Sequence, residues 1–312
     1  MNRRRLAPQC AVAVSPRRIE CAQISRIGQG RPVVKLFSSE PVQGTVAETL
    51  AGMRKTGRLD RYRITTLLES RRYQIHQVDA PDVPEAELRS AVRWRLKDLL
   101  DYPPDAATVD VLPVPSERDG SGPAKHLFAV AARNDDVAAC MRLFDGAKLV
   151  LDAIDIPELA QRNIATLFEE SARGVAVLCF DDSGGLLTIS AGGELYVARN
   201  LDAKAAQIRA ALGEARDALF ERIVLELQRS LDYFDRQFGG LLVSRLLLAP
   251  VAGADALRQH LGDNLYLPVE LLDLGKVLDL QGVAGLAQPE DQARALHLLG
   301  AALRNSPPVP AP

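Results

Sequence analysis

The segment GVAVLCFDDSGGLLTISAGGELYVAR, residues 174–199, decides the fold of the second half of the chain. Its unbroken apolar run, 175–180, is typical of a strand that is buried on both faces. The sequence DDSGG at 181–185 predicts a tight turn, and the glycine pair at 192–193 predicts a two-residue hairpin turn. We therefore expect a meander of three strands, at 175–180, 186–190 and 194–199.

The first of these turns has the shape of a phosphate cradle but not the charge. A strand, a small polar turn and a returning strand can hold phosphate when the turn points backbone N–H groups at it. Here Asp181 and Asp182 precede Ser183 and Gly184, so the turn adds two carboxylates. We therefore interpret these four residues as a degenerate phosphate turn.

Length and charge limit the functional classes. The 312 residues suffice for two domains, each with its own core. A net charge of −2 provides no overall basic field, which disfavours nucleic acid as a partner. The start, MNRRRLAPQC, lacks the apolar core of a signal peptide, and no stretch approaches the ~20 apolar residues of a membrane span. These features predict a cytoplasmic protein without a membrane span of its own.

The cysteines and histidines show no pattern of metal binding or catalysis. No CxxC motif and no zinc-ligand spacing occurs. We expect the cysteines to be reduced core residues and expect no metal site, and no Ser-His-Asp or paired-carboxylate arrangement can be argued. The residues concerned are Cys10, Cys21, Cys140, Cys179, His76, His126, His260 and His297.

The order of predicted elements divides the chain into two similar halves. Each half begins with a strand meander and continues into helices and further strands, and the longest helix is expected at 214–238. A strand–helix–strand insert interrupts the first half. The predicted units are a first lobe at 1–173 with a small inserted α/β subdomain at about 59–133, a second lobe at 174–304 and a disordered tail at 305–312.

A helix is predicted at 84–100 within the insert. Pro84 suits its first turn, and one side carries Leu88, Val92, Arg95, Leu96 and Leu99. Trp94, the only tryptophan, lies about a third of a turn from that side. Two readings stay open for Trp94: an exposed anchor for a partner, or a side chain packed beneath a neighbouring strand or loop. Farther along, Asn134 and Asp202 are expected to cap helices.

Two stretches resemble the PilM-like proteins of type IV pilus assembly. They are VPEAELRSAVRWRLKDLLDYPPDAATVDVLPVP at 83–115 and HLFAVAARNDDVAACMRLFDGAKLVLDAIDIPELA at 126–160. Within that family the resemblance is greatest to proteins of the mannose-sensitive haemagglutinin (MSHA) pilus system. It spans roughly 10–297, and its most specific part is the segment around Arg93-Trp94 and Lys97-Asp98-Leu99.

The resemblance implies a fold, a location and a partner. The fold is α/β and actin-like, related to FtsA, with two lobes around a nucleotide cleft and a small inserted subdomain. Members lie in the cytoplasm against the inner membrane, where they hold a short cytoplasmic segment of a PilN-like membrane-anchored protein. In this chain the insert, with Trp94 and Arg95, is then the first candidate for the partner surface.

The resemblance also shows where nucleotide should bind and why this chain departs from it. ATP-binding members use two Asp-x-Gly turns and a glycine-rich turn for adenosine. Matching places Ala13 and Ser15 at the first Asp and Gly, with Glu20 where a Lys is common. It places Cys179 and Asp181 at the second pair, and Pro250-Val251-Ala252 at the adenosine turn.

We therefore expect a pseudo-ATPase that acts as a scaffold without a cofactor. Two alternatives stay open. In one, Asp181 or Asp182 holds magnesium and the chain is a working ATPase that binds Mg-ATP. In the other, the chain is the cytoplasmic part of a type II secretion protein, which has a related fold.

Overall fold

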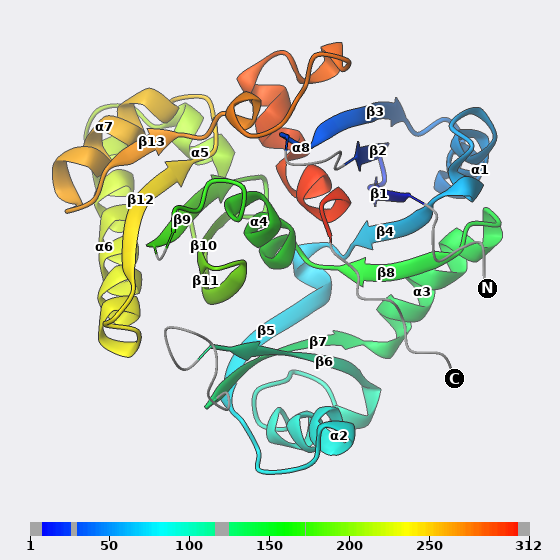
Figure 1. Cartoon of the computed structure of the whole chain (residues 1–312), viewed down its shortest axis with the longest axis horizontal. Coiled ribbons are helices and arrows are strands. Elements are labelled where there is room, and N and C mark those ends of the chain that lie inside the picture. The colour runs from blue at the N-terminus through cyan, green and yellow to red at the C-terminus, as the bar shows by residue number, and fades with distance from the viewer. Residues whose placement is uncertain (1–7, 26–29, 116–124, 172, 305–312) are drawn as a thin grey trace.

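The computed structural model describes residues 8–25, 30–115, 125–171 and 173–304. Two lobes lie side by side, and a smaller third unit lies below them in Figure 1. Each lobe is built on one five-stranded sheet, and the third unit has a three-stranded sheet. The tail 305–312, for which the sequence predicts disorder, lies outside the described residues.

The first-lobe sheet has the strand order β3-β2-β1-β4-β8. Its first three strands form the expected antiparallel meander, and β4 and β8 extend the sheet in parallel with β1. Alternate residues of β1 face opposite sides, as the pleat requires. Its strands are β1 (Gln9–Val14), β2 (Arg18–Ser25), β3 (Val33–Pro41), β4 (Arg63–Leu67) and β8 (Leu151–Asp155).

The second-lobe sheet repeats this order as β11-β10-β9-β12-β13. The predicted meander is confirmed: β9, β10 and β11 are antiparallel neighbours, and β12 and β13 continue in parallel with β9. Gly192 and Gly193 both have positive φ, 59° and 79°, as the hairpin turn requires. The strands are β9 (Arg173–Phe180), β10 (Gly185–Ala191), β11 (Glu194–Leu201), β12 (Leu242–Leu248) and β13 (Val269–Leu271).

Helices cover both faces of each sheet. The outer face of the first sheet packs on α1 (Val46–Thr56) and α3 (Asn134–Gly146). The second sheet packs on α6 (Gly213–Gln237) and α7 (Ala254–Asn264), with the short α5 (Ala205–Ala210) beside them. The long helix α6 is amphipathic as predicted; its buried stripe contains Leu219, Phe220, Ile223, Val224, Leu227, Leu231 and Phe234.

Two central helices hold the lobes together. Helix α4 (Pro157–Ala165) follows a first-lobe strand but packs on the second sheet, and α8 (Pro289–Ala302) follows second-lobe elements but packs on the first sheet. The two helices contact each other closely, because Gly300 has no side chain: a Cβ there would lie 2.0 Å from the Ala160 carbonyl oxygen. Figure 1 shows the pair between the lobes.

The inserted unit lies between β4 and β8 in the chain. Its antiparallel sheet has the order β5-β7-β6, and α2 (Glu85–Arg95) covers one face. This helix is shorter than the predicted 84–100, and Arg95 and Leu99 are exposed rather than part of the buried side. The strands are β5 (Tyr73–Asp79), β6 (Ala107–Val114) and β7 (His126–Arg133).

Both predicted helix caps are wrong. The residues at the cap positions of α3 and α5 are Arg133 and Lys204. The side chain of Asn134 instead bonds to Thr108 Oγ1 and to the carbonyl of Asp105, so it fastens the helix to the inserted sheet. Short polar residues compete for such contacts as well as for caps, and tertiary structure decides between them.

Candidate functional site

A polar cleft of about 230 Å³ opens between the lobes. Its walls come from the β9–β10 turn, the end of β11, the first turn of α4, the connection between β4 and β5, and α8. Residues far apart in the sequence therefore meet here. Those that line the cleft include Ser70, Arg71, Glu158, Cys179, Asp181, Ser183, Gly184, Asn200 and His297.

The predicted phosphate turn lines this cleft, but its backbone donors are already bonded. The carboxylate Oδ1 of Asp181 accepts from the backbone N–H of Ser183 (2.7 Å) and of Gly184 (3.0 Å), and from the Ser183 hydroxyl. These are the amides that would otherwise face an anion. Asp182 is exposed and is not among the residues that line the cleft. The Asp181 carboxylate thus occupies the backbone N–H groups of its own turn.

Gln161 is fully buried behind the cleft and contacts two residues that line it, Cys179 and His297. Its Nε2 donates to the carbonyl of Val177 (2.8 Å) and to Thr188 Oγ1 (2.9 Å), which fixes Oε1 as the acceptor end of the amide. The thiol of Cys179 lies 3.0 Å from that oxygen. Burial raises the pKa of Cys179, so it is a neutral thiol donor rather than a thiolate. A neutral thiol at this position does not replace a metal-binding aspartate.

His297 completes this network from α8. Its Nε2 lies 3.1 Å from Oε1 of Gln161, which can only accept, so the ring carries its proton on Nε2. Burial lowers the pKa of His297 to about 4, although Asp181 acts in the opposite direction. The imidazole is therefore neutral at pH 7 and contributes no positive charge to an anion in the cleft.

A buried carboxyl group lies at the start of α4. Glu158 Oε2 accepts a hydrogen bond from the Tyr73 hydroxyl at 2.6 Å, and both side chains are buried. Desolvation raises the pKa of Glu158, although the Tyr73 hydrogen bond partly offsets it, and desolvation also raises the pKa of Tyr73. This contact ties the inserted subdomain to the central helix.

The cleft is small and carries more acidic than basic side chains. Two carboxyl groups, Glu158 and Asp181, line it against one basic side chain, Arg71. Two like charges at ~4 Å repel by ~4 kcal/mol at an effective dielectric constant near 20. The cleft is also smaller than the ~300–1,000 Å³ of typical small-molecule sites. Within the described residues, no cluster of three or more His, Cys, Asp or Glu side chains could hold a metal.

The other two predicted nucleotide turns lie elsewhere. Ser15 and Pro16, in the turn between β1 and β2, line a second cavity of about 350 Å³ in the first lobe, and Pro250-Val251-Ala252 lines neither cavity. The structure therefore does not bring the three turns together on one of these cavities.

The second cavity is mostly apolar. It lies at the end of β1 and β4, beside α1 and α3, with Glu69 and Arg72 at the side toward the inserted subdomain. We refer to it as the apolar cavity. Its apolar lining consists of Val14, Pro16, Val46, Leu67, Leu68, Ala139, Cys140, Leu143 and Phe144.

The predicted partner residues lie on the surface of α2. Trp94 is 58% exposed, so the reading in which it packs beneath a strand or loop is wrong. Arg95 is also exposed and donates to the carbonyl of Asp79. Neither residue lines either of the two cavities. Glu158, which lines the cleft, and the buried polar residues Gln161 and Tyr73 behind it gave no signal in the sequence, because their partners are distant along the chain.

The fold defined by these lobes, with their duplicated sheets and two crossing central helices, is actin-like. Among solved structures, the chain resembles the PilM–PilN type IV pilus biogenesis complex, with 20% identity, a TM-score of 0.72, and coverage of 95% of this chain and 98% of that chain. It also resembles a protein with an actin-like ATPase fold and unknown function from Bacteroides thetaiotaomicron, with 9% identity, a TM-score of 0.50, and coverage of 90% and 96%.

A further similar structure is the cytoplasmic domain of EpsL, an inner membrane component of the type II secretion system of Vibrio cholerae. It has 13% identity, a TM-score of 0.49, and coverage of 96% of each chain. A scan against known protein families finds no match, and neither does a search of curated proteins. No helix in the described residues is long and apolar enough to cross a membrane.

Proposed function

We propose that this chain is a scaffold of a type IV pilus assembly system that works without ATP hydrolysis. The observation that carries the proposal is the Asp181 carboxylate on the amides of its own turn, in the place where an actin-like ATPase needs free donors. The likeness to a PilM–PilN complex over nearly the whole chain supports the pilus assignment.

The finer assignment is to the MSHA pilus and to a protein of the MshI type. It rests on the sequence resemblance in 83–115 and 126–160. In this role the protein lies in the cytoplasm, peripheral to the inner membrane, and holds a short cytoplasmic segment of a PilN-like partner. Such docking needs shape and apolar contact but no catalytic group.

The apolar cavity is the better of two candidate docking places. An extended segment can bury apolar side chains in it, and Glu69 and Arg72 at its edge can bond to the peptide. The exposed Trp94 on α2 remains the alternative, since exposed tryptophans often anchor partners.

Calorimetry with the cytoplasmic peptide of the PilN-like protein from the same organism tests this proposal. Ala139→Trp fills the apolar cavity from α3 and should weaken binding at least tenfold, because the peptide's side chains lose their space. Met141→Trp on the same helix is the matched control, since Met141 is 51% exposed and lies outside the cavity.

The outcomes separate the two surfaces. Loss of binding in Trp94→Ala, with Ala139→Trp unchanged, would move docking to α2 and keep the scaffold role. No binding of the peptide to folded wild-type protein would contradict the proposed function itself.

A further inference from the structure

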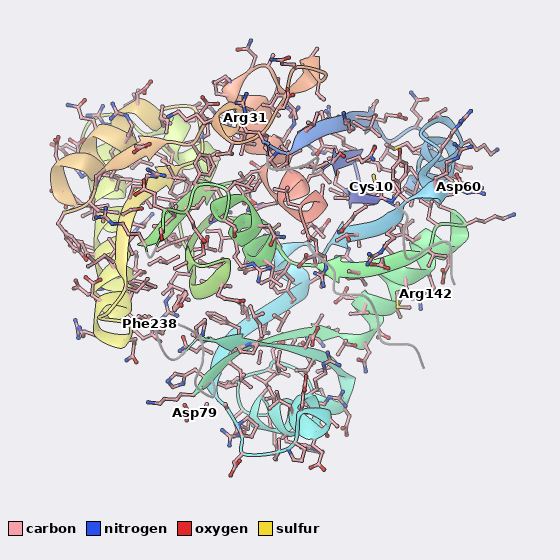
Figure 2. All side chains as sticks on the ribbon, viewed as in Figure 1. Cys10, Arg31, Asp60, Asp79, Arg142 and Phe238 are labelled. Atoms are coloured by element: carbon pink, nitrogen blue, oxygen red, sulfur yellow. The ribbon has the colours of Figure 1, made fainter. Side chains whose placement is uncertain are left out.

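The end of the first lobe that lies farthest from the second lobe is strongly basic. It is formed by residues 54–63, which join α1 to β4, and residues 142–152, which join α3 to β8. Both lie at the right edge of Figure 1, and Figure 2 labels Asp60 and Arg142 there. The Arg63–Asp152 ion pair and a shared apolar cluster hold the two segments together. We call this surface the basic end.

Its charge is opposite to that of the whole chain. Seven basic and three acidic residues lie in the two segments, whereas the chain carries a net charge of −2. Five of the basic side chains are exposed and form no ion pair within the described part of the chain. These five are Lys55, Arg58, Arg61, Arg142 and Lys148.

Large apolar side chains are exposed among these cations. Met141 and Val150 are each 51% exposed; Met141 directly precedes residues 142–152, and Val150 lies within them. Single exposed apolar residues are common on proteins, but these two flank Arg142 and Lys148. The basic end therefore combines exposed positive charges with exposed apolar side chains that a binding partner could bury.

Two of these five cations occupy backbone positions where glycine is usual. Arg58 and Lys148 have φ values of 50° and 58°, and they are the only residues other than glycine with positive φ in the described chain. Each follows the C-terminus of a helix, a position where glycine is usual. A cation there also interacts favourably with the helix dipole, but that effect does not account for Arg61 or Arg142.

We propose that the basic end binds directly to the surface of membranes that contain anionic phospholipids. The five exposed cations meet lipid phosphates, and Met141 and Val150 enter the interface. Nucleic acid fits less well, because single-stranded binding uses exposed aromatic platforms and Tyr62 here packs into the lobe core. The proposal is independent of the pilus partner.

Co-sedimentation of the full chain with lipid vesicles, without any partner protein, tests this inference. Vesicles of phosphatidylcholine alone are compared with vesicles that contain 30% phosphatidylglycerol, at ~0.05 and ~0.3 M salt. We expect binding to the anionic vesicles only, and weaker binding at high salt because screening shortens the reach of the charges.

The decisive variant is Arg58→Gln/Arg61→Gln/Lys148→Gln. Each surface cation contributes about fivefold to partitioning, so the triple variant should bind roughly 100-fold more weakly. The matched control, Arg209→Gln/Arg229→Gln/Arg236→Gln, removes the same charge from exposed sites in the second lobe and should bind as the wild type does.

Melting temperatures check that both variants are folded. Equal binding to neutral and anionic vesicles, equal loss in both variants, or no vesicle binding at low salt would each overturn the proposal. The last result, together with tight binding to single-stranded DNA, would assign the basic end to nucleic acid instead.

Discussion

The polar cleft and the apolar cavity occupy related places in a duplicated fold, yet they have opposite chemistry. The β9–β10 turn lines the cleft, and its counterpart, the β1–β2 turn, lines the apolar cavity. In the first, the Asp181 carboxylate bonds to the turn amides. In the second, Pro16 has no N–H, and the N–H groups of Ser15 and Arg18 bond within the turn.

The same strand–turn–strand frame therefore occurs twice, and the backbone N–H groups of its two turns are bonded in different ways. In the β9–β10 turn, beside the polar cleft, the backbone N–H groups donate to the Asp181 carboxylate of the same turn. The β1–β2 turn instead borders the apolar cavity, whose lining suits an apolar segment.

The largest effect is expected at the contact between α4 and α8, the two helices that place Glu158 and His297 in the cleft. In Gly300→Ala the new methyl group must displace the Ala160 carbonyl, so the free energy of unfolding should fall by about 3 kcal/mol. Thermal unfolding measures this as a fall of ~2–4 °C per kcal/mol. The control, Gly52→Ala on α1, meets no atom within 4 Å and should leave stability equal or slightly higher.

The next effect concerns the pH dependence of the cleft. Because His297 has its pKa lowered to about 4, the unfolded state binds its proton first, and stability is lost as pH falls below ~6.5. Between pH 7.5 and 5 this loss amounts to at most about 2 kcal/mol. In His297→Gln it should be absent, as denaturant unfolding at the two pH values will show. An unchanged slope in the variant would contradict the assignment.

Glu158 provides a contrast of opposite sign. Burial raises the pKa of Glu158 in the folded state. The protonated side chain therefore contributes fully to stability at pH values below its ordinary pKa, and this contribution is lost as pH rises through the raised pKa. Glu158→Gln keeps a partner for the Tyr73 hydroxyl but cannot ionise. The variant should therefore gain stability relative to the wild type as pH rises from 4 to 7, by the same unfolding measurement.

The smallest expected effect is that of nucleotide. Millimolar Mg-ATP should leave the melting temperature of the wild type unchanged, because the turn donors are occupied and the cleft is acidic. A ligand at ~100 times its dissociation constant would add ~2.7 kcal/mol, which is several degrees. A clear shift, with ATPase activity that Asp181→Ala abolishes, would replace the scaffold reading with the ATPase alternative.

Much of the frame could be predicted from local sequence. The apolar run at 175–180, the glycine pair at 192–193 and the apolar stripe of α6 specify their elements through short-range geometry, and all are confirmed. The repeated order of elements also predicted two lobes with an insert. These features depend on residues a few positions apart, so a single sequence contains the information.

The chemistry of the cavities depended on tertiary structure. Glu158 meets Tyr73 from 85 residues away, and His297 reaches Gln161 across 136 residues, so no local pattern could pair them. The predicted cap at Asn134 failed for the same reason, since its side chain bonds to residues 26 and 29 positions earlier in the chain. The sequence by itself determined which strands and helices form and that Asp181 stands in the phosphate turn. That carboxylate bonds within its own turn, to amides two and three residues away. Only the packing of the two lobes decided what faces the turn across the cleft, because the other lining residues come from four separate parts of the chain.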